Sequence, residues 1–313
     1  MKKNKSNFRG SDIAHTYSIV ARDHKTGEMG VGVQSHYFSV GSIVSWGESG
    51  VGVVATQSLV NASCGLRGLE LLKQGKSPKE ALDSLISEDE GKDVRQVAIL
   101  DAQGRVAAHT GSKCIKHAGH IEGNNFSVQA NMMLTDKVWS TMAKSFESNV
   151  NLPLAERILK TMEAAETVGG DIRGKQSAAI LIVGGKEAKN KWEDRIIDLR
   201  VEDNEQPVKE LSRLLKLHRA YKHMDKGDLA IEHNDMENAL MEYDSALNMF
   251  PENLEMKFWT AISLANNQKL KEASELFKTI FIKDNNWRLL TERLPESGLL
   301  NLTKKELEDI LSL

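Results

Sequence analysis

Cysteine is scarce in this chain of 313 residues, which contains only Cys64 and Cys114. Two thiols cannot form a disulfide framework, and so few are typical of a protein from a reducing compartment. The first fifteen residues are polar and lack the apolar middle of a signal peptide. No apolar stretch is long enough to cross a bilayer. We therefore expect a cytoplasmic protein with no membrane partner.

Excess positive charge is also missing. The chain has 41 Lys and Arg against 44 Asp and Glu, so its formal net charge is −3. Proteins that bind nucleic acid normally carry a basic patch or stripe, and none is visible here. Nucleic acid is therefore excluded as an expected partner.

Common cofactor and metal motifs are absent as well. The chain has no GxxxxGK[ST] phosphate loop, no HExxH and no GxSxG. His109, Cys114, His117 and His120 lie close together, but their spacing, H-x4-C-x2-H-x2-H, fits none of the usual paired-ligand zinc sites. We predict neither a cofactor nor a metal.

Residues 16–205 show alternating strand and helix patterns. Strands are predicted at 16–22, 29–35, 51–57, 94–100, 105–109, 126–132, 177–183 and 195–201, and helices at 66–72, 77–86, 138–146 and 154–168. Three strands are thus expected before any helix. The order strands, helix pair, strands, helix pair, strands indicates an α+β domain of two packed sheets with helices outside each.

After a polar hinge at 202–207 the strand signal disappears, and a repeat with an offset of 34 residues begins. Ala239 recurs as Ala273, and Tyr243 recurs as Phe277. The first copy has the small, aromatic and proline positions of a tetratricopeptide unit: Gly227, Ala239, Tyr243, Ala246 and Pro251. We predict a small all-α tetratricopeptide-like domain at 206–313. Two units need further cover, from residues 211–217, from a tail helix capped at 303–306 or from the first domain.

Thr16 is the candidate catalytic nucleophile, because it stands at the start of the first predicted strand. A threonine hydroxyl is a poor nucleophile without an adjacent base. If residues 1–15 were a leader or propeptide, the freed α-amine of Thr16, with a pKa of roughly 7.7 to 8.0, could act as that base. The alternative is that Thr16 merely begins an ordinary strand.

Several separate segments resemble a bacterial and archaeal family catalogued as domain of unknown function 1028. They are 15–23 (HTYSIVARD), 34–36 (QSH), 55–57 (ATQ), 128–131 (VQAN), 169–179 (GGDIRGKQSAA) and 194–200 (DRIIDLR). The likeness covers about residues 14–205. That family is placed in the N-terminal-nucleophile (Ntn) hydrolase-like superfamily, so the resemblance implies a four-layer αββα sandwich at 16–205 and attack on an amide by the first residue of the mature chain.

Carried over by position, the resemblance implies that Thr16 is the nucleophile and that Asn131 donates to the oxyanion. Gln34, Ser35, His36 and Gln57 fall near strand ends, where they could line the same cleft or simply satisfy a loop backbone. His15 stands where self-cleaving relatives have glycine.

The segment 169–175 concentrates Asp171, Arg173 and Lys175 in a glycine-rich turn. Arg173 and Lys175 could hold a substrate carboxylate, with Asp171 orienting Arg173 or the attacking amine; a plain helix stop would explain the glycines equally. We expect a hydrolase of a small-molecule or peptide amide that forms a homo-oligomer and docks a protein partner through residues 211–313. The alternative is a non-catalytic binding or scaffold protein.

Overall fold

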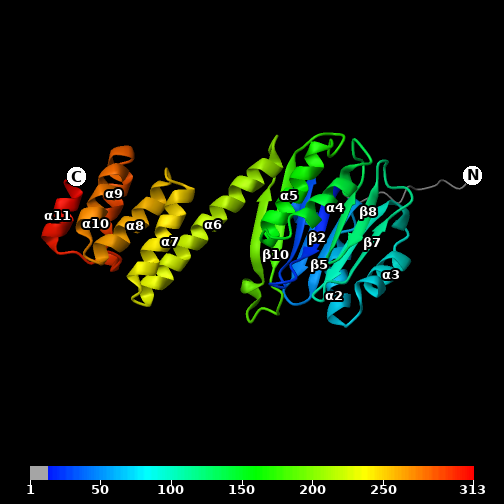
Figure 1. Cartoon of the computed structure of the whole chain (residues 1–313), viewed down its shortest axis with the longest axis horizontal. Coiled ribbons are helices and arrows are strands. Elements are labelled where there is room, and N and C mark those ends of the chain that lie inside the picture. Colours follow the sequence, from blue (N-terminus) through cyan, green and yellow to red (C-terminus); the bar gives the residue numbers. More distant parts are fainter. Residues whose placement is uncertain (1–12) are drawn as a thin grey trace, which may run out of the picture. The chain divides into compact units, whose positions relative to one another are not determined.

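The computed structural model describes residues 13–313, and predicted leader residues 1–12 lie outside the described part (Figure 1). The chain divides after Leu215 into two compact units. The first unit contains the strands, and the second contains only helices. The predictions of an α+β region followed by a helical region are confirmed.

Within the described residues, the first unit has a six-stranded and a five-stranded antiparallel sheet. The larger sheet has the order β11-β10-β3-β2-β9-β8. Its strands are β2 (Thr16–Arg22), β3 (Met29–Ser35), β8 (Gly119–Gly123), β9 (Phe126–Ala130), β10 (Ser177–Val183) and β11 (Arg195–Val201). The smaller sheet has the order β1-β5-β6-β7, with β4 also paired to β5. Its strands are β1 (Ile13–Ala14), β4 (Ser45–Glu48), β5 (Gly52–Leu59), β6 (Arg95–Asp101) and β7 (Val106–Thr110).

Alternation along the strands gives each sheet two apolar faces. Val20 and Val33 from the larger sheet share a buried cluster with Val53 and Ala98 from the smaller one, so these faces pack against each other. The opposite face of the smaller sheet is covered by α2 (Ser63–Lys73) and α3 (Pro78–Glu88). The opposite face of the larger sheet is covered by α4 (Val138–Ser148) and α5 (Leu154–Thr167) (Figure 1). Two neighbouring residues of one strand therefore point their side chains to opposite faces of the sheet, one toward the other sheet and one toward the helices.

The contact between α5 and β3 depends on a missing side chain. A Cβ built on Gly32 would lie 2.4 Å from Ile158 Cγ2 and 2.9 Å from Met162 Sδ. Neither distance is tolerated by real side chains, so glycine at this position lets the helix lie directly on the strand.

The expectation of three strands before any helix is wrong in detail. A four-residue helix, α1 (Gly41–Val44), and β4 come between β3 and β5. β8, at Gly119–Gly123, is a strand that the sequence pattern did not predict. These elements have four or five residues each, too few to show a period, and β8 has glycine at both ends. Pairing with β5 holds β4 extended, and pairing with β9 holds β8 extended.

The predicted domain boundary at 205/206 lies ten residues before the division between the compact units. Helix α6 (Pro207–Glu232) contributes Val208, Leu211 and Leu215 to the apolar cluster on the outer face of the larger sheet. A polar hinge in the sequence marks the end of the last strand, but the first unit's core continues into the following helix.

The second unit is built from the rest of α6 and further helices. They are α7 (Met236–Met249), α8 (Leu254–Asn266), α9 (Leu270–Lys283), α10 (Asn286–Arg293) and α11 (Lys304–Leu311). Short 3-10 turns occur at η1 (Lys92–Val94), η2 (Lys191–Glu193) and η3 (Pro295–Ser297). Tyr243 and Phe277, the aromatic pair of the 34-residue repeat, are fully buried on α7 and α9.

Gly227 leaves room for the Tyr243 ring, since a Cβ at residue 227 would lie 2.4 Å from that ring. The tail helix α11 supplies Ile310 to the apolar cluster of the last helices. Leu217 packs on the other cluster of this unit. Of the predicted covering segment 211–217, only Leu217 packs in the helical unit, because Leu211 and Leu215 belong to the cluster on the larger sheet.

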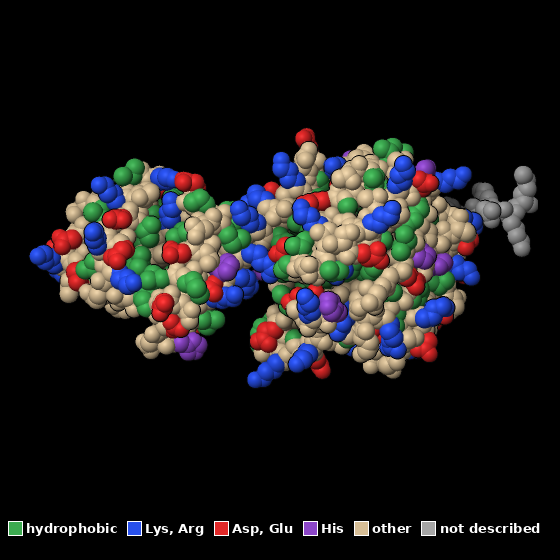
Figure 2. Space-filling view, viewed as in Figure 1, with side chains coloured by type: hydrophobic (Ala, Val, Ile, Leu, Met, Phe, Trp, Pro, Cys, Tyr) green, Lys and Arg blue, Asp and Glu red, His purple; other side chains and the backbone are tan. Residues whose placement is uncertain are grey.

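Charges of both signs alternate over the face of the molecule seen in Figure 2. Among the helices described in residues 13–313, none combines the length and the apolar character that a membrane crossing requires.

Candidate functional site

Thr16 lies at the start of β2, at one end of the gap between the two sheets. It pairs with Ser35 on β3 and is completely buried. Its hydroxyl donates a hydrogen bond of 2.8 Å to the carbonyl oxygen of Ala14. Ala14 belongs to β1 and pairs with Ser58 on β5. In this structure the residues just before Thr16 are part of the folded domain.

The carbonyl oxygen of His15, in the peptide bond that precedes Thr16, accepts two side-chain hydrogen bonds. Arg173 Nη2 donates to it at 2.6 Å, and Ser35 Oγ donates at 2.7 Å. One of these donors is charged, which makes the bond stronger than one between neutral groups. This carbonyl is therefore polarised by two converging donors.

Asp171 fixes the orientation of Arg173. Its carboxylate accepts from Arg173 Nη2 at 2.7 Å and from Arg173 Nε at 3.1 Å. The same carboxylate accepts from the backbone N–H groups of His36 at 3.1 Å and of Arg173 itself at 2.9 Å. The Asp171 side chain is fully buried, whereas that of Arg173 is 27% exposed. The guanidinium is thus held by a bidentate ion pair that points it at the His15 carbonyl.

Asn131 lies on the other side of Thr16. Its Nδ2 donates to the carbonyl oxygen of Thr16 at 3.3 Å, one peptide further along than the His15 carbonyl. Its Oδ1 lies 2.8 Å from Nδ1 of His15, so the His15 ring donates from Nδ1. The residues that contact the His15 carbonyl are Arg173 and Ser35, to which the sequence had given a role in substrate binding.

Behind Thr16, six buried polar residues form an inter-sheet amide network: Ser18, Gln57, Gln96, Ser127, Gln129 and Asn131. Gln57 Nε2 donates to Gln96 Oε1 at 2.6 Å and to the Thr16 carbonyl at 3.2 Å. Gln96 Oε1 also accepts from Asn131 Nδ2 at 2.9 Å. The network therefore positions the backbone of Thr16 from the side of the smaller sheet.

Sequence reasoning missed four members of this network, Ser18, Gln96, Ser127 and Gln129. A signal was present, because Ser127 and Gln129 on β9 and Asn131 just after it alternate with apolar residues. A period of two places all three on one face of a strand. A row of polar residues on a buried strand face indicates a polar layer inside the protein.

A cavity of about 520 Å³ reaches the edge of this network. Its lining includes Thr110, Cys114, Gly119 and His120. Gln96 Nε2 donates to Thr110 Oγ1 at 2.8 Å and to the carbonyl oxygen of Gly119 at 3.2 Å. Within residues 13–313, no group of three or more His, Cys, Asp or Glu side chains is placed to hold a metal ion.

Three predicted site residues lie away from Thr16. Gln34 lies on the other face of β3, next to Tyr17. Lys175 forms an ion pair with Glu166 on α5. His36 is exposed, and its ring nitrogen Nδ1 lies 3.4 Å from the carbonyl oxygen of Lys175. The structure does not bring these three side chains to the site around Thr16. It does bring together the other six predicted residues: Thr16, Ser35, Gln57, Asn131, Asp171 and Arg173.

His15 makes the stability of this site depend on pH. Burial lowers the pKa of His15 below its ordinary value of 6.5, and the charge of Arg173 acts in the same direction, although Asn131 and Asp171 oppose both. The unfolded chain therefore binds the proton more tightly than the folded chain. We expect His15 to reduce the free energy of unfolding as the pH falls below 6.5, by at most about 1.4 kcal/mol per pH unit.

Urea unfolding of Thr16→Ala and of His15→Gln/Thr16→Ala across this pH range measures that component, because both chains keep residue 15 and the carboxylates titrate in both and cancel. His117→Gln in the same Thr16→Ala chain is the matched control, since His117 is exposed. A stability difference between the first two chains that stays constant with pH would contradict the expectation.

Residues 16–211 match the model of a family of unknown function, DUF1028, and the chain belongs to that family. Its fold is similar to the crystal structure of protein SPO2555 from Silicibacter pomeroyi, which is assigned to the same family. The two chains are 28% identical with a TM-score of 0.59, over 65% of this chain and 85% of the other. No curated protein matches the chain.

Proposed function

We propose that the first unit is an amide hydrolase of the N-terminal-nucleophile type and that Thr16 becomes its nucleophile when the His15–Thr16 bond is cleaved. The observation that carries this proposal is the pair of donors, Arg173 and Ser35, on the His15 carbonyl oxygen. Negative charge develops on that oxygen when the carbonyl carbon is attacked, and donors already aimed at it stabilise the transition state.

Cleavage follows from the chemistry of the adjacent hydroxyl. Thr16 Oγ attacks the carbonyl carbon of His15, the C–N bond breaks, and the proton from the hydroxyl ends on the Thr16 nitrogen. His15 is then joined to Thr16 by an ester. Water hydrolyses this ester and leaves a carboxylate on His15 and a free amine on Thr16. That amine, with a pKa of about 7.7 to 8.0, is close enough to accept the hydroxyl proton in later turnovers.

An amide substrate would place its carbonyl where the His15 carbonyl lies now. Arg173 and Ser35 would then hold its oxyanion, and Asn131 and Gln57 would continue to fix the Thr16 backbone. The 520 Å³ cavity lined by Thr110 and Gly119, both of which bond to Gln96, would be the surface that a small amide or peptide meets at this edge of the amide network. The helix, sheet, sheet, helix order of the first unit agrees with the αββα sandwich of this superfamily. The family match also begins at Thr16.

A non-catalytic scaffold is the second candidate, and a specific observation favours it. Thr16 is fully buried, its hydroxyl is engaged by Ala14, and Ala14 and His15 are themselves buried. A chain that keeps these residues would leave Thr16 closed to any ligand. In either case the helical unit, with its 34-residue spacing and the Gly227–Tyr243 contact, suits a tetratricopeptide-like arm that docks a protein or a second copy of the chain.

Intact mass of the purified full chain separates the two candidates. We expect a product that begins at Thr16 and, because threonine and serine hydroxyls can both attack, the same product from Thr16→Ser. Thr16→Ala must retain residues 1–15. Cleavage of Thr16→Ala would assign the cut to another protease, and a wild-type chain that stays uncut under all conditions would favour the scaffold.

A further inference from the structure

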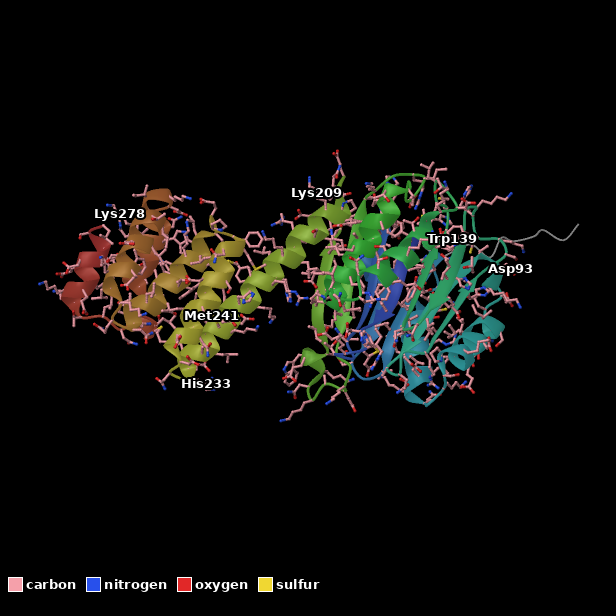
Figure 3. All side chains as sticks on the ribbon, in the orientation of Figure 1. Asp93, Trp139, Lys209, His233, Met241 and Lys278 are labelled. Atoms are coloured by element: carbon pink, nitrogen blue, oxygen red, sulfur yellow. The ribbon has the colours of Figure 1, made fainter. Side chains whose placement is uncertain are left out.

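A second cavity lies on the opposite face of the larger sheet from Thr16, between α5 and the start of α6. It has a volume of about 300 Å³. It is lined by Glu163, Glu166, Lys175, Gln206, Val208, Lys209 and Ser212. Figure 3 labels Lys209 near the first turn of α6. All of these residues belong to the first unit.

The charged groups of this cavity are segregated. Both acids, Glu163 and Glu166, come from α5. The two lysines come from other segments, Lys175 from the turn before β10 and Lys209 from α6. Lys175 nevertheless touches Glu166, and Glu163 pairs with Lys160 on its own helix at 2.7 Å, which leaves Lys209 as the lysine of the lining with no ion pair among the described residues.

Glu166 is held in place from inside the protein. The hydroxyl of the fully buried Tyr17 donates to Glu166 Oε1, and Lys175 pairs with Glu166 Oε2. The Glu166 side chain is only 13% exposed, compared with 42% for Lys175. Burial and the nearby Glu166 charge raise the pKa of Tyr17 well above its usual value, so the phenol stays a donor. The carboxylate is thus fixed, while its lysine partner can move toward solvent.

A buried amide beside Tyr17 has unused hydrogen-bonding capacity. Gln34 is opposite Tyr17 in the sheet register and is fully buried. Neither its Oε1 nor its Nε2 has a hydrogen-bond partner among the residues that the structure describes. Such a group is costly inside a protein unless something pairs with it. Gln34 does not line the cavity, so the case for a ligand rests on the charged residues that do.

We propose that this cavity binds a small zwitterion, a free α-amino acid, with its ammonium toward Glu166 and Glu163 and its carboxylate toward Lys175 and Lys209. An α-amino acid carries both charges within a few bonds of each other, which matches a carboxylate and an ammonium that already touch. A simple anion would use only Lys175 and Lys209 and would gain nothing from the carboxylates of Glu163 and Glu166. The site is separate from Thr16 chemistry, because it lies on the other face of the sheet.

The test uses the full chain carrying Thr16→Ala, so that cleavage cannot affect the result. Isothermal titration with each standard α-amino acid is expected to reveal at least one that binds. Its deaminated and decarboxylated analogues should each bind at least about tenfold more weakly, because each loses one charge-assisted contact. Lys175→Met and Glu166→Gln should weaken binding by a similar factor. Ser212→Trp, which fills the cavity without touching the ion pair, should abolish binding.

Lys191→Met is the matched control, since Lys191 pairs with Glu48 and does not line the cavity. It should leave the affinity unchanged. The proposal is overturned if no standard amino acid binds, if the deaminated acid binds as tightly as its parent, or if Ser212→Trp retains the wild-type affinity in a folded chain.

Discussion

Replacing Arg173 with methionine is expected to slow cleavage of the His15–Thr16 bond by a factor of about 100 to 1,000, the usual loss when one oxyanion donor is removed. Arg173 supplies the charged member of the two donors on the His15 carbonyl, at 2.6 Å. Ser35→Ala removes the neutral donor and should slow cleavage in the same direction. The rates are measured by intact mass at intervals after cell-free synthesis of the full chain.

Loss of Arg173 would also leave the Asp171 carboxylate buried without a cation, which is destabilising by itself. The double variant Asp171→Asn/Arg173→Met removes that complication and should be as slow as the single variant. Lys175→Met is the control two residues further on, and it should cleave at the wild-type rate because Lys175 pairs with Glu166 instead. Wild-type rates in both Arg173 variants, with circular dichroism showing them folded, would rule out the oxyanion role.

Replacing Gln96 with leucine is expected to lower the free energy of unfolding of the first unit by about 2 to 6 kcal/mol. Gln96 Oε1 accepts from Gln57 Nε2 at 2.6 Å and from Asn131 Nδ2 at 2.9 Å. Leucine has a similar volume but no acceptor, so two buried N–H groups lose a partner at about 1 to 3 kcal/mol each. Gln57 and Asn131 also hold the Thr16 carbonyl, and the variant should therefore cleave more slowly as well.

Urea unfolding followed by tryptophan fluorescence measures this loss in chains that all carry Thr16→Ala, so that every chain keeps residues 1–15. Trp259 and Trp287 of the second unit are first replaced by phenylalanine, so that the signal comes from the first unit. Gln103→Leu, in an exposed turn, is the matched control and should change stability by less than about 0.5 kcal/mol. Equal stability of Gln96→Leu and Gln103→Leu would mean that the inter-sheet amide network contributes little.

Local pattern was enough to predict the main strands and helices. The capping box that begins α11 at Thr303 forms as expected, and α3 begins with another at Ser77, because each needs only residues three positions apart. Short elements such as α1 and β8 were missed because four or five residues are too few to show a period.

The sequence by itself determined which segments alternate with a period of two or of three to four residues, and so the α+β region, the helical region and the polar stripe of β9. Only the tertiary structure decided which polar residues meet. Arg173 and Lys175 are two residues apart, yet one contacts the His15 carbonyl and the other contacts Glu166 on α5. Ser35 and Gln34 are adjacent but lie on opposite faces of β3, with Ser35 toward Thr16. Sheet register and the packing of layers fix these partners, and neither is encoded in the local spacing of residues.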